Sequence, residues 1–122
     1  MQLTNHFHSR EFNCPCCDKE RMDKDFIETL EACRILAGVP FVITSGYRCE
    51  EHNEKIGGHP SSAHSKGLAV DIRYRNGACG RKIVDAASKC NFEGIEVGTR
   101  HIHLDDTCRS HGEKVLWTAV SK

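Results

Sequence analysis

The stretch "SSAHSKGLAVDI" at residues 61–72 joins a polar loop to an apolar segment. Apolar residues alternate with other types along "LAVDIRY", residues 68–74, and this period of two predicts a β-strand. The same period places Asp71 on the face of the strand opposite its larger apolar side chains. His64 lies on the loop that leads into the strand.

A second segment with the same period follows at "RHIHLDD", residues 100–106. It places three polar side chains together on one face of a strand: His101, His103 and Asp105. If the two strands are neighbours, Asp71 and His103 point to the same side of the sheet, and His64 can reach them from its loop. Two histidines and one carboxylate form a catalytic zinc set, because three protein ligands leave one position open. The alternative is that these are ordinary solvated side chains, since the spacing alone is not specific.

The rest of the chain predicts an α+β fold. Helical spacing of apolar residues predicts one long helix between Asp23, as its N-cap, and Gly38, and a second over residues 79–90. "EEHNEKI" predicts a short helix at residues 50–56. We expect a buried strand at residues 41–44 and further strands at 94–97, 101–105 and 114–120. Helices and strands do not alternate regularly, so we expect a small, mostly antiparallel sheet with flanking helices in a single domain spanning residues 1–122.

Composition excludes several function classes. Hydrophobic residues make up 39% and charged residues 28%, as in ordinary globular proteins. The 17 lysines and arginines equal the 17 aspartates and glutamates, so the net charge does not favour binding to nucleic acid or to an anionic membrane. No apolar run approaches the about 20 residues of a membrane span, and the first residues lack the features of a secretory signal. We therefore expect synthesis in the cytoplasm without a signal peptide and no nucleic-acid or membrane partner. We also expect a monomer.

Eight cysteines stand out, three of them in "CPCC" at residues 14–17. A structural metal there would need a fourth ligand, for which His6, His8 and Cys49 are candidates. Disulfides are the alternative after release into an oxidising space, and eight cysteines allow 105 full pairings. Cys33 and Cys90, at helical positions, are expected in the core.

The blocks "SGYRCEEHNEKIGGHPSSAHSKGLAVDI" (residues 45–72) and "HIHLD" (residues 101–105), with "EF-C" from residue 11, resemble the peptidase M15 family. That family comprises zinc D-alanyl-D-alanine carboxypeptidases, D-Ala-D-Ala dipeptidases and phage L-alanyl-D-glutamate endopeptidases. The match covers most of the chain. Each block alone is a weak signal, but the blocks together are highly specific for the family. The resemblance implies a hedgehog/D,D-peptidase-like fold, with zinc over an antiparallel sheet.

By position, the resemblance implies that His64, Asp71 and His103 bind zinc. Arg48 of "SGYR" matches an arginine that pairs with a substrate carboxylate or with the developing oxyanion, and a guanidinium fork suits either task. Ser62 matches a serine that contacts substrate, with a loop-capping hydroxyl as the alternative.

The general base is where the chain departs from better-known members of the family. Their carboxylate position holds Arg100, which cannot accept a proton. His101 is our first candidate for the acid/base or oxyanion-stabilising group, and Glu96 is the second. Asp105 could instead orient a zinc histidine through its second nitrogen.

The function implied is a zinc metallopeptidase acting on the stem peptides of peptidoglycan, as a D,D-carboxypeptidase or a cell-wall endopeptidase. A phage endolysin released through a holin is one role that fits, and a tail- or head-associated protein is another. The alternative is a non-catalytic, zinc-stabilised binding module of the hedgehog type, which the missing carboxylate at Arg100 keeps open.

Overall fold

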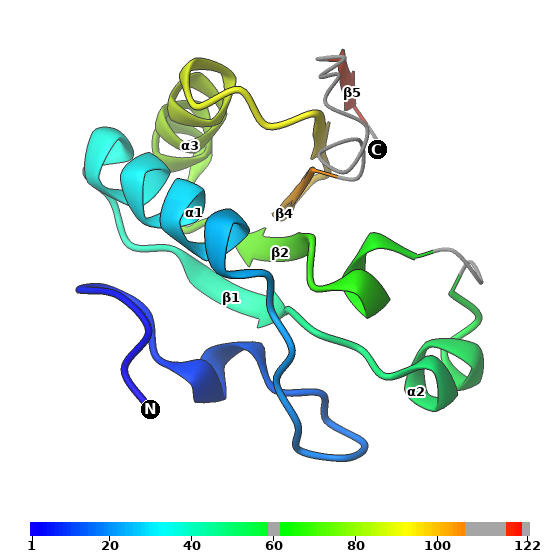
Figure 1. Ribbon diagram of the computed structural model, residues 1–122. Coiled ribbons are helices and arrows are strands. Elements are labelled where there is room, and N and C mark those ends of the chain that lie inside the picture. The colour runs from blue at the N-terminus through cyan, green and yellow to red at the C-terminus, as the bar shows by residue number, and fades with distance from the viewer. Residues whose placement is uncertain (59–61, 107–116, 121–122) are drawn as a thin grey trace.

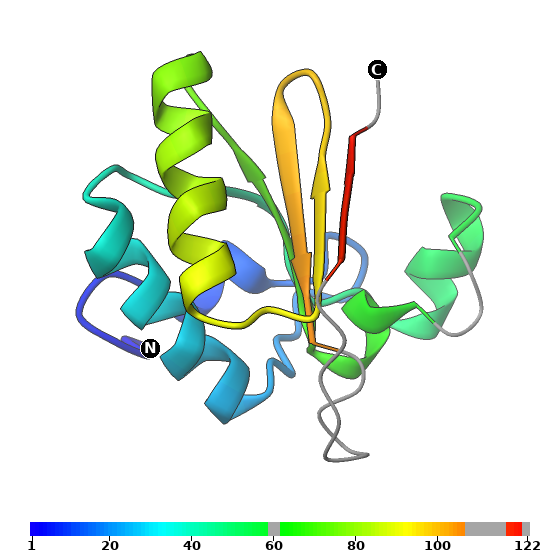
Figure 2. The same cartoon turned by 90° about the horizontal axis from the view of Figure 1, so that it is seen from above.

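A computed structural model describes residues 1–58, 62–106 and 117–120. Two long helices, α1 (Lys24–Ala37) and α3 (Gly77–Lys89), pack against each other and against one face of a five-stranded sheet. The short helix α2 (Glu50–Lys55) and the 3-10 helix η2 (Ala63–Lys66) lie on the other side (Figure 1 and Figure 2). The predicted α+β class is confirmed.

The sheet has the strand order β1-β2-β4-β3-β5. All neighbouring pairs are antiparallel except β3 and β5, which are parallel. A mostly antiparallel sheet is therefore confirmed. The strands run over the following ranges: β1 Val42–Ser45, β2 Ala69–Arg73, β3 Gly94–Val97, β4 His101–Asp105 and β5 Trp117–Val120.

The register of the central strands aligns one row of polar residues across the sheet. Asp71 of β2 pairs with His103 of β4, and His103 pairs in turn with Glu96 of β3. Residues paired across neighbouring strands project from the same face, so these three side chains rise from one side of the sheet. That side is the one opposite α1 and α3.

The other face of the sheet forms the hydrophobic core with the two long helices. Side chains that alternate with the polar row are fully buried there, and they come from β2, β3 and β4: Val70, Ile72, Ile95, Ile102 and Leu104. Phe26 of α1 meets Phe92 edge to face, with ring centroids 5.5 Å apart. Cys33 of α1 is fully buried, as predicted, and Cys90 packs half-buried against the same core. Burial on one face thus leaves the opposite face free for polar side chains.

Capping residues set the limits of the helices. The Asp23 carboxylate accepts a hydrogen bond from the backbone of Phe26, and Gly38 ends α1 with a left-handed φ of 68°. Helix α3 begins at Gly77 rather than at the predicted residue 79, because the Asn76 side chain caps it. The remaining predicted elements are present within one or two residues of their expected ends, except that residues 114–116 of the last strand lie outside the described residues.

The prediction that residues 41–44 form a buried strand is wrong in part. The strand is present as β1, but Val42 is 45% exposed. The reason is the register of the sheet: Val42 pairs with Arg73, which pairs in turn with His101, so Val42 projects from the polar face, which α1 and α3 do not cover.

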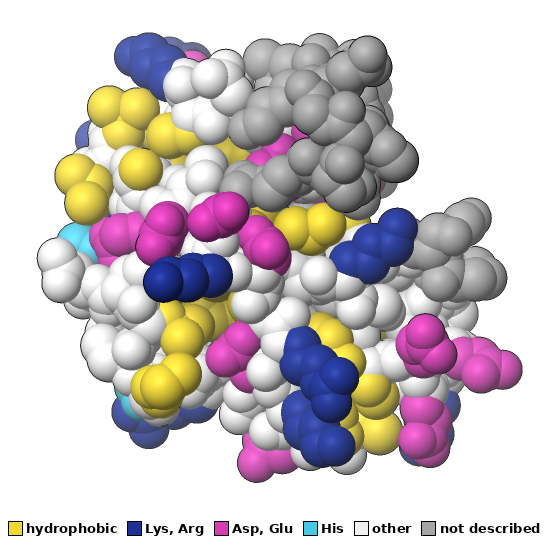
Figure 3. Space-filling view, viewed as in Figure 1, with side chains coloured by type: hydrophobic (Ala, Val, Ile, Leu, Met, Phe, Trp, Pro, Cys, Tyr) yellow, Lys and Arg dark blue, Asp and Glu magenta, His cyan; other side chains and the backbone are white. Residues whose placement is uncertain are grey.

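The surface agrees with the equal numbers of acidic and basic residues. On the face shown in Figure 3, acidic and basic side chains are intermixed, with small apolar patches between them. Within the part of the chain that the structure describes, no helix has both the length and the apolar character needed to cross a membrane.

Candidate metal centre and active site

His64, Asp71 and His103 come together above the polar face of the sheet. One ligand atom from each lies within 4.8 Å of the others. His64 comes from η2, Asp71 from β2 and His103 from β4, so a loop and two paired strands build the group. The structure therefore brings together the three residues that the sequence predicted as metal ligands.

His64 is held in one orientation by the main chain. Its Nδ1 donates a hydrogen bond to the Gly46 carbonyl oxygen at 2.8 Å, and the residue is only 4% exposed. A carbonyl oxygen can only accept, so Nδ1 carries a hydrogen and Nε2 is the atom left for a metal. Nε2 faces Asp71 Oδ1 at 3.5 Å.

His103 lies between two carboxylates. Its Nε2 is 2.8 Å from Asp105 Oδ2, and its Nδ1 is 2.9 Å from Asp71 Oδ1. Burial disfavours the charged form of His103, but the hydrogen bonds with Asp105 and Asp71 outweigh burial and raise the pKa of His103 to about 9. Burial alone would raise the pKa of Asp71, but the hydrogen bonds from His103 and His64 hold that pKa well below its ordinary value.

This donor set fits a metal ion. Each histidine directs one nitrogen to an outer acceptor, the Gly46 carbonyl or the Asp105 carboxylate, and the other nitrogen to Asp71. Metal-binding histidines are oriented in this way, because the outer hydrogen bond selects the tautomer and makes the ligand nitrogen more basic. Two imidazoles and one carboxylate also leave a fourth tetrahedral position open.

Arg48 lies against the same group. Its Nη2 is 3.4 Å from Asp71 Oδ2, and its Nε donates to Ser45 Oγ at 3.1 Å. Its backbone N–H donates to the His64 carbonyl oxygen at 3.3 Å. Arg48 is thus fixed at the site by both its side chain and its backbone, and the negative charge of Asp71 is shared between a guanidinium and two imidazoles.

A hollow of about 340 Å³ lies directly over the polar row of the sheet. Glu96 and His101, the two predicted candidates for proton transfer, are exposed and line it together with two of the metal-binding candidates. Arg100 is not among the lining residues. The full lining consists of Thr44, Asp71, Glu96, Gly98, His101 and His103.

The comparisons with known proteins agree with this geometry. The family model described as "Peptidase M15" matches residues 5–105. The chain belongs to the peptidase M15 family. A solved structure, the crystal structure of Serratia marcescens L-Ala D-Glu endopeptidase ChiX, superposes with a TM-score of 0.50 at 18% sequence identity, covering 75% of this chain and 85% of that one. At this identity the likeness concerns the fold. A search of curated proteins finds no match.

Two of the predicted site residues of this M15 peptidase have structural roles that their contacts show. Ser62 Oγ accepts a hydrogen bond from the His64 backbone at 3.2 Å and caps η2. Asp105 contacts His103 Nε2, as expected for a residue that orients a metal ligand. Contact of Ser62 or Arg48 with a substrate stays a prediction.

Three contributors to the M15 peptidase site were missed in the sequence. They lie on or just after β1: the Gly46 carbonyl, which orients His64; Ser45, which holds Arg48; and Thr44, which lines the hollow. Ser45 and Thr44 directly precede the "GYR" motif, and this adjacency is the feature that could have indicated them. The role of Gly46 depends on the fold of two loops, and no side-chain pattern indicates it.

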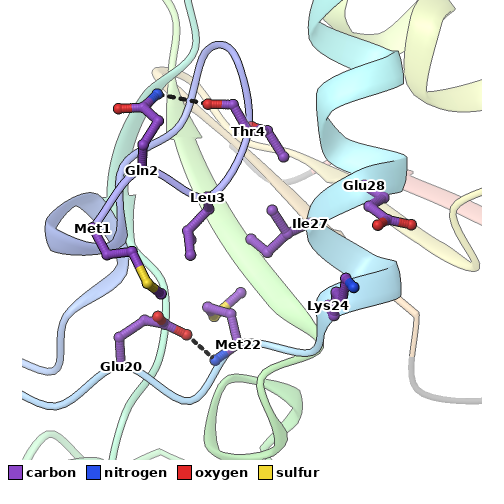
Figure 4. A pocket seen from close by; sticks show the side chains of 9 residues that line it. All are labelled: Met1, Gln2, Leu3, Thr4, Glu20, Met22, Lys24, Ile27 and Glu28. Atoms are coloured by element: carbon purple, nitrogen blue, oxygen red, sulfur yellow. Dashed lines mark hydrogen bonds between the residues drawn. The ribbon is translucent and has the colours of Figure 1, made fainter.

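A second cavity of about 390 Å³ lies between the N-terminal segment and α1 (Figure 4). Its apolar walls include Leu3, Met22 and Ile27, and none of the predicted site residues lines it. It offers neither a histidine nor a cysteine as a metal ligand. We therefore place the candidate active site of this M15 peptidase over the sheet.

Proposed function

We propose that this M15 peptidase is a zinc enzyme that hydrolyses the stem peptide of peptidoglycan, as a D,D-carboxypeptidase or an L-alanyl-D-glutamate endopeptidase. The observation that carries the proposal is the convergence of His64 Nε2, His103 Nδ1 and the Asp71 carboxylate beside an open hollow. The name of the similar Serratia marcescens structure, an L-Ala D-Glu endopeptidase, supports the substrate class.

The metal would be held by His64, Asp71 and His103. When bound at such a site, zinc polarises a scissile carbonyl and lowers the pKa of water to about 7. The protein's own part is to keep the two imidazoles oriented, through Gly46 and Asp105, so that the ligand atoms are in place before the metal arrives.

Arg48 is the residue we propose for charge recognition. Its guanidinium has more donors than its contacts with Asp71 and Ser45 use, so further N–H groups can bind a substrate carboxylate or the oxyanion that develops during hydrolysis. Ser62 is close in sequence to His64, and its hydroxyl is proposed as a second substrate contact besides its capping role.

Proton transfer falls to His101 and Glu96 in this proposal. Both line the hollow, and Glu96 is the cross-strand neighbour of the metal-ligand candidate His103. A hydrolytic peptidase needs one group that takes a proton from water and returns it to the leaving amine. We propose His101 for this role first and Glu96 second, because Arg100 cannot accept a proton.

Cleavage of isolated cell walls tests the function. Purified protein loaded with zinc is incubated with sacculi and with defined muropeptides, and the products are identified by mass spectrometry. Release of terminal D-alanine indicates a carboxypeptidase, and a new amino-terminal D-glutamate indicates an endopeptidase. His103→Ala serves as the matched variant and should give no product.

Binding to cell walls without cleavage would indicate the alternative function. If the wild-type protein at full zinc occupancy cleaves no wall among several wall chemistries but binds them, the chain is a zinc-stabilised binding module. A role as a phage endolysin predicts, in addition, lysis of cells when the protein is applied from outside to permeabilised bacteria or co-expressed with a holin.

A further inference from the structure

Three cysteine thiols from two separate parts of the chain meet beside the loop between β1 and α2, residues 46–49, which carries Arg48 and is called the active-site loop below. Cys14 and Cys17 lie in the segment between η1 (Ser9–Phe12) and α1, and Cys49 is the N-cap of α2. Their sulfur atoms all lie within 4.8 Å of one another, and those of Cys14 and Cys49 are 3.6 Å apart. All three cysteines are free.

The spacing and the surroundings of these sulfur atoms suit a thiolate-bound metal. Zinc–sulfur bonds of about 2.3 Å in a tetrahedron place the sulfur atoms about 3.8 Å apart. Backbone N–H groups of Cys16, Cys17 and Cys49 donate hydrogen bonds to the sulfur of Cys14, which is fully buried. The His52 backbone donates to the sulfur of Cys49 at 3.4 Å. Several N–H donors on one sulfur favour its deprotonated form, which is the form that binds metal.

Cys16 is the best-placed fourth ligand. Its thiol is exposed and interacts with that of Cys49. The two histidines that the sequence offered as alternatives are used elsewhere. His6 pairs with Glu31, and His8 caps η1.

We propose that Cys14, Cys16, Cys17 and Cys49 bind a second, structural zinc ion, distinct from the one proposed over the sheet. Four thiolates form a closed site, since no position is left open for water or substrate. The "CPCC" run supplies three of the ligands, and Cys49, over thirty residues later, supplies the fourth.

The consequence for the enzyme follows from the position of Cys49. It directly follows Arg48, so the metal would tie the active-site loop to the N-terminal segment. The loop already lies close to that segment, because the Tyr47 backbone donates to the Phe12 carbonyl at 2.9 Å and a Cβ on Gly46 would be 2.7 Å from Phe12 Cα. The metal would add a side-chain tie to these backbone contacts and hold Arg48 in place.

Cobalt substitution under reducing conditions tests the second site without an activity assay. Thiolate-bound Co²⁺ shows a charge-transfer absorption in the near ultraviolet that a histidine and carboxylate site does not show. The variants are Cys49→Ser, Cys16→Ser, His103→Ala and, as the matched control, Cys79→Ser on α3, away from the cluster.

We expect two cobalt ions per wild-type chain and one equivalent of the thiolate absorption. His103→Ala should lose one ion and keep the absorption, whereas Cys49→Ser should lose the absorption and keep one ion. Cys79→Ser should resemble the wild type. Loss of the band in Cys16→Ser would confirm the fourth ligand.

The proposal is overturned if the reduced wild type shows no thiolate absorption, or if the absorption survives in Cys49→Ser. It is also overturned if mass spectrometry finds Cys14 and Cys49 joined in a disulfide in the folded protein. If Cys49→Ser does not fold, the wild type and His103→Ala still decide the matter. The cobalt result does not depend on whether the protein cleaves cell walls. The proposed cysteine site and the proposed peptidase function can therefore be contradicted independently.

Discussion

At the scale of single residues, His103 is a base whose proton must leave before a metal can bind. Its pKa in the metal-free protein is raised from 6.5 to about 9, so at pH 7 it is charged and lies between the carboxylates of Asp71 and Asp105. The folded protein thus holds this proton more tightly than the unfolded chain does. The resulting stabilisation is complete below about pH 6.5 and is lost as the pH rises through about 9.

This proton gives a first prediction. Zinc binding at pH 7 should release about one proton from His103, and the apparent affinity should fall about tenfold for each pH unit below 9 over the range where only this group titrates. The measurement uses Cys49→Ser, so that thiol protons from the proposed cysteine site do not contribute, and calorimetry in two buffers of different ionisation enthalpy then measures the proton released by His103. Adding His103→Ala to this variant removes the effect, and equal heats in both buffers for Cys49→Ser alone would contradict the prediction.

A second prediction distinguishes the histidine that binds the metal from the histidine that transfers the proton. His103→Ala should abolish zinc binding at the sheet site, whereas His101→Ala should keep zinc and lower kcat/KM by about 10²–10⁴-fold, the usual contribution of a general acid or base. Zinc content by elemental analysis and the rate of muropeptide cleavage are measured on the same samples. Equal zinc loss in both variants would show that the two histidines have been assigned the wrong way round.

At the scale of elements, the pairing of β3 with β4 means that a substitution of Gly94 can affect the metal site, although Gly94 is not next to a candidate metal ligand. Gly94 pairs with Asp105, and a Cβ there would lie 2.5 Å from a carboxylate oxygen of that residue. The carboxylate is the flexible end of a side chain, so it can move aside without disrupting the strand. Moving it, however, removes the outer partner of His103.

We therefore predict that Gly94→Ala folds but binds zinc at the sheet site about 10-fold or more weakly, the usual effect of losing an outer hydrogen bond to a metal ligand. Gly77→Ala is the control, because a Cβ at Gly77 meets nothing within 4 Å. Zinc titration and thermal unfolding measure affinity and folding together. Unchanged affinity in Gly94→Ala would mean that Asp105 does not support His103.

The strands of the site and the approach of His64 from its loop could be predicted from the sequence, and the contacts between separate loops could not. A period of two places Asp71 and His103 on the polar face of any sheet that buries the intervening apolar residues, so pairing β2 with β4 was enough to join them. The contact of Arg48 with Asp71 and the orientation of His64 by the Gly46 carbonyl depend on how separate elements pack. The local periodicity of apolar residues does not predict such contacts.

At the scale of the whole molecule, metal and fold should be coupled. Two of the three candidate ligands at the sheet are on neighbouring strands, and the cysteine cluster joins the N-terminal segment to α2. A ligand that binds only the folded state stabilises it by about 4 kcal/mol at 1,000 times its Kd. Metal bound at either site should therefore stabilise most of the chain.

We predict that chelation lowers the Tm of the wild type and that zinc restores it. The loss should be smaller in Cys49→Ser and in His103→Ala, each of which keeps one site, and should vanish in the double variant. Differential scanning calorimetry with and without chelator makes the measurement. A Tm that does not respond to chelation in the zinc-loaded wild type would contradict the coupling.

The two histidines of the sheet site differ in what supports them, and this sets how the site can change over evolutionary time. His64 is oriented by the Gly46 carbonyl, a main-chain group that keeps its place only while residue 46 is glycine, because a Cβ there would lie 2.7 Å from Phe12 Cα. His103 is oriented by Asp105, which a single nucleotide change can replace. One half of the site is therefore restricted to glycine at position 46, and the other is open to gradual adjustment. Drift in metal affinity among variants of this protein should arise mainly from the Asp105 side.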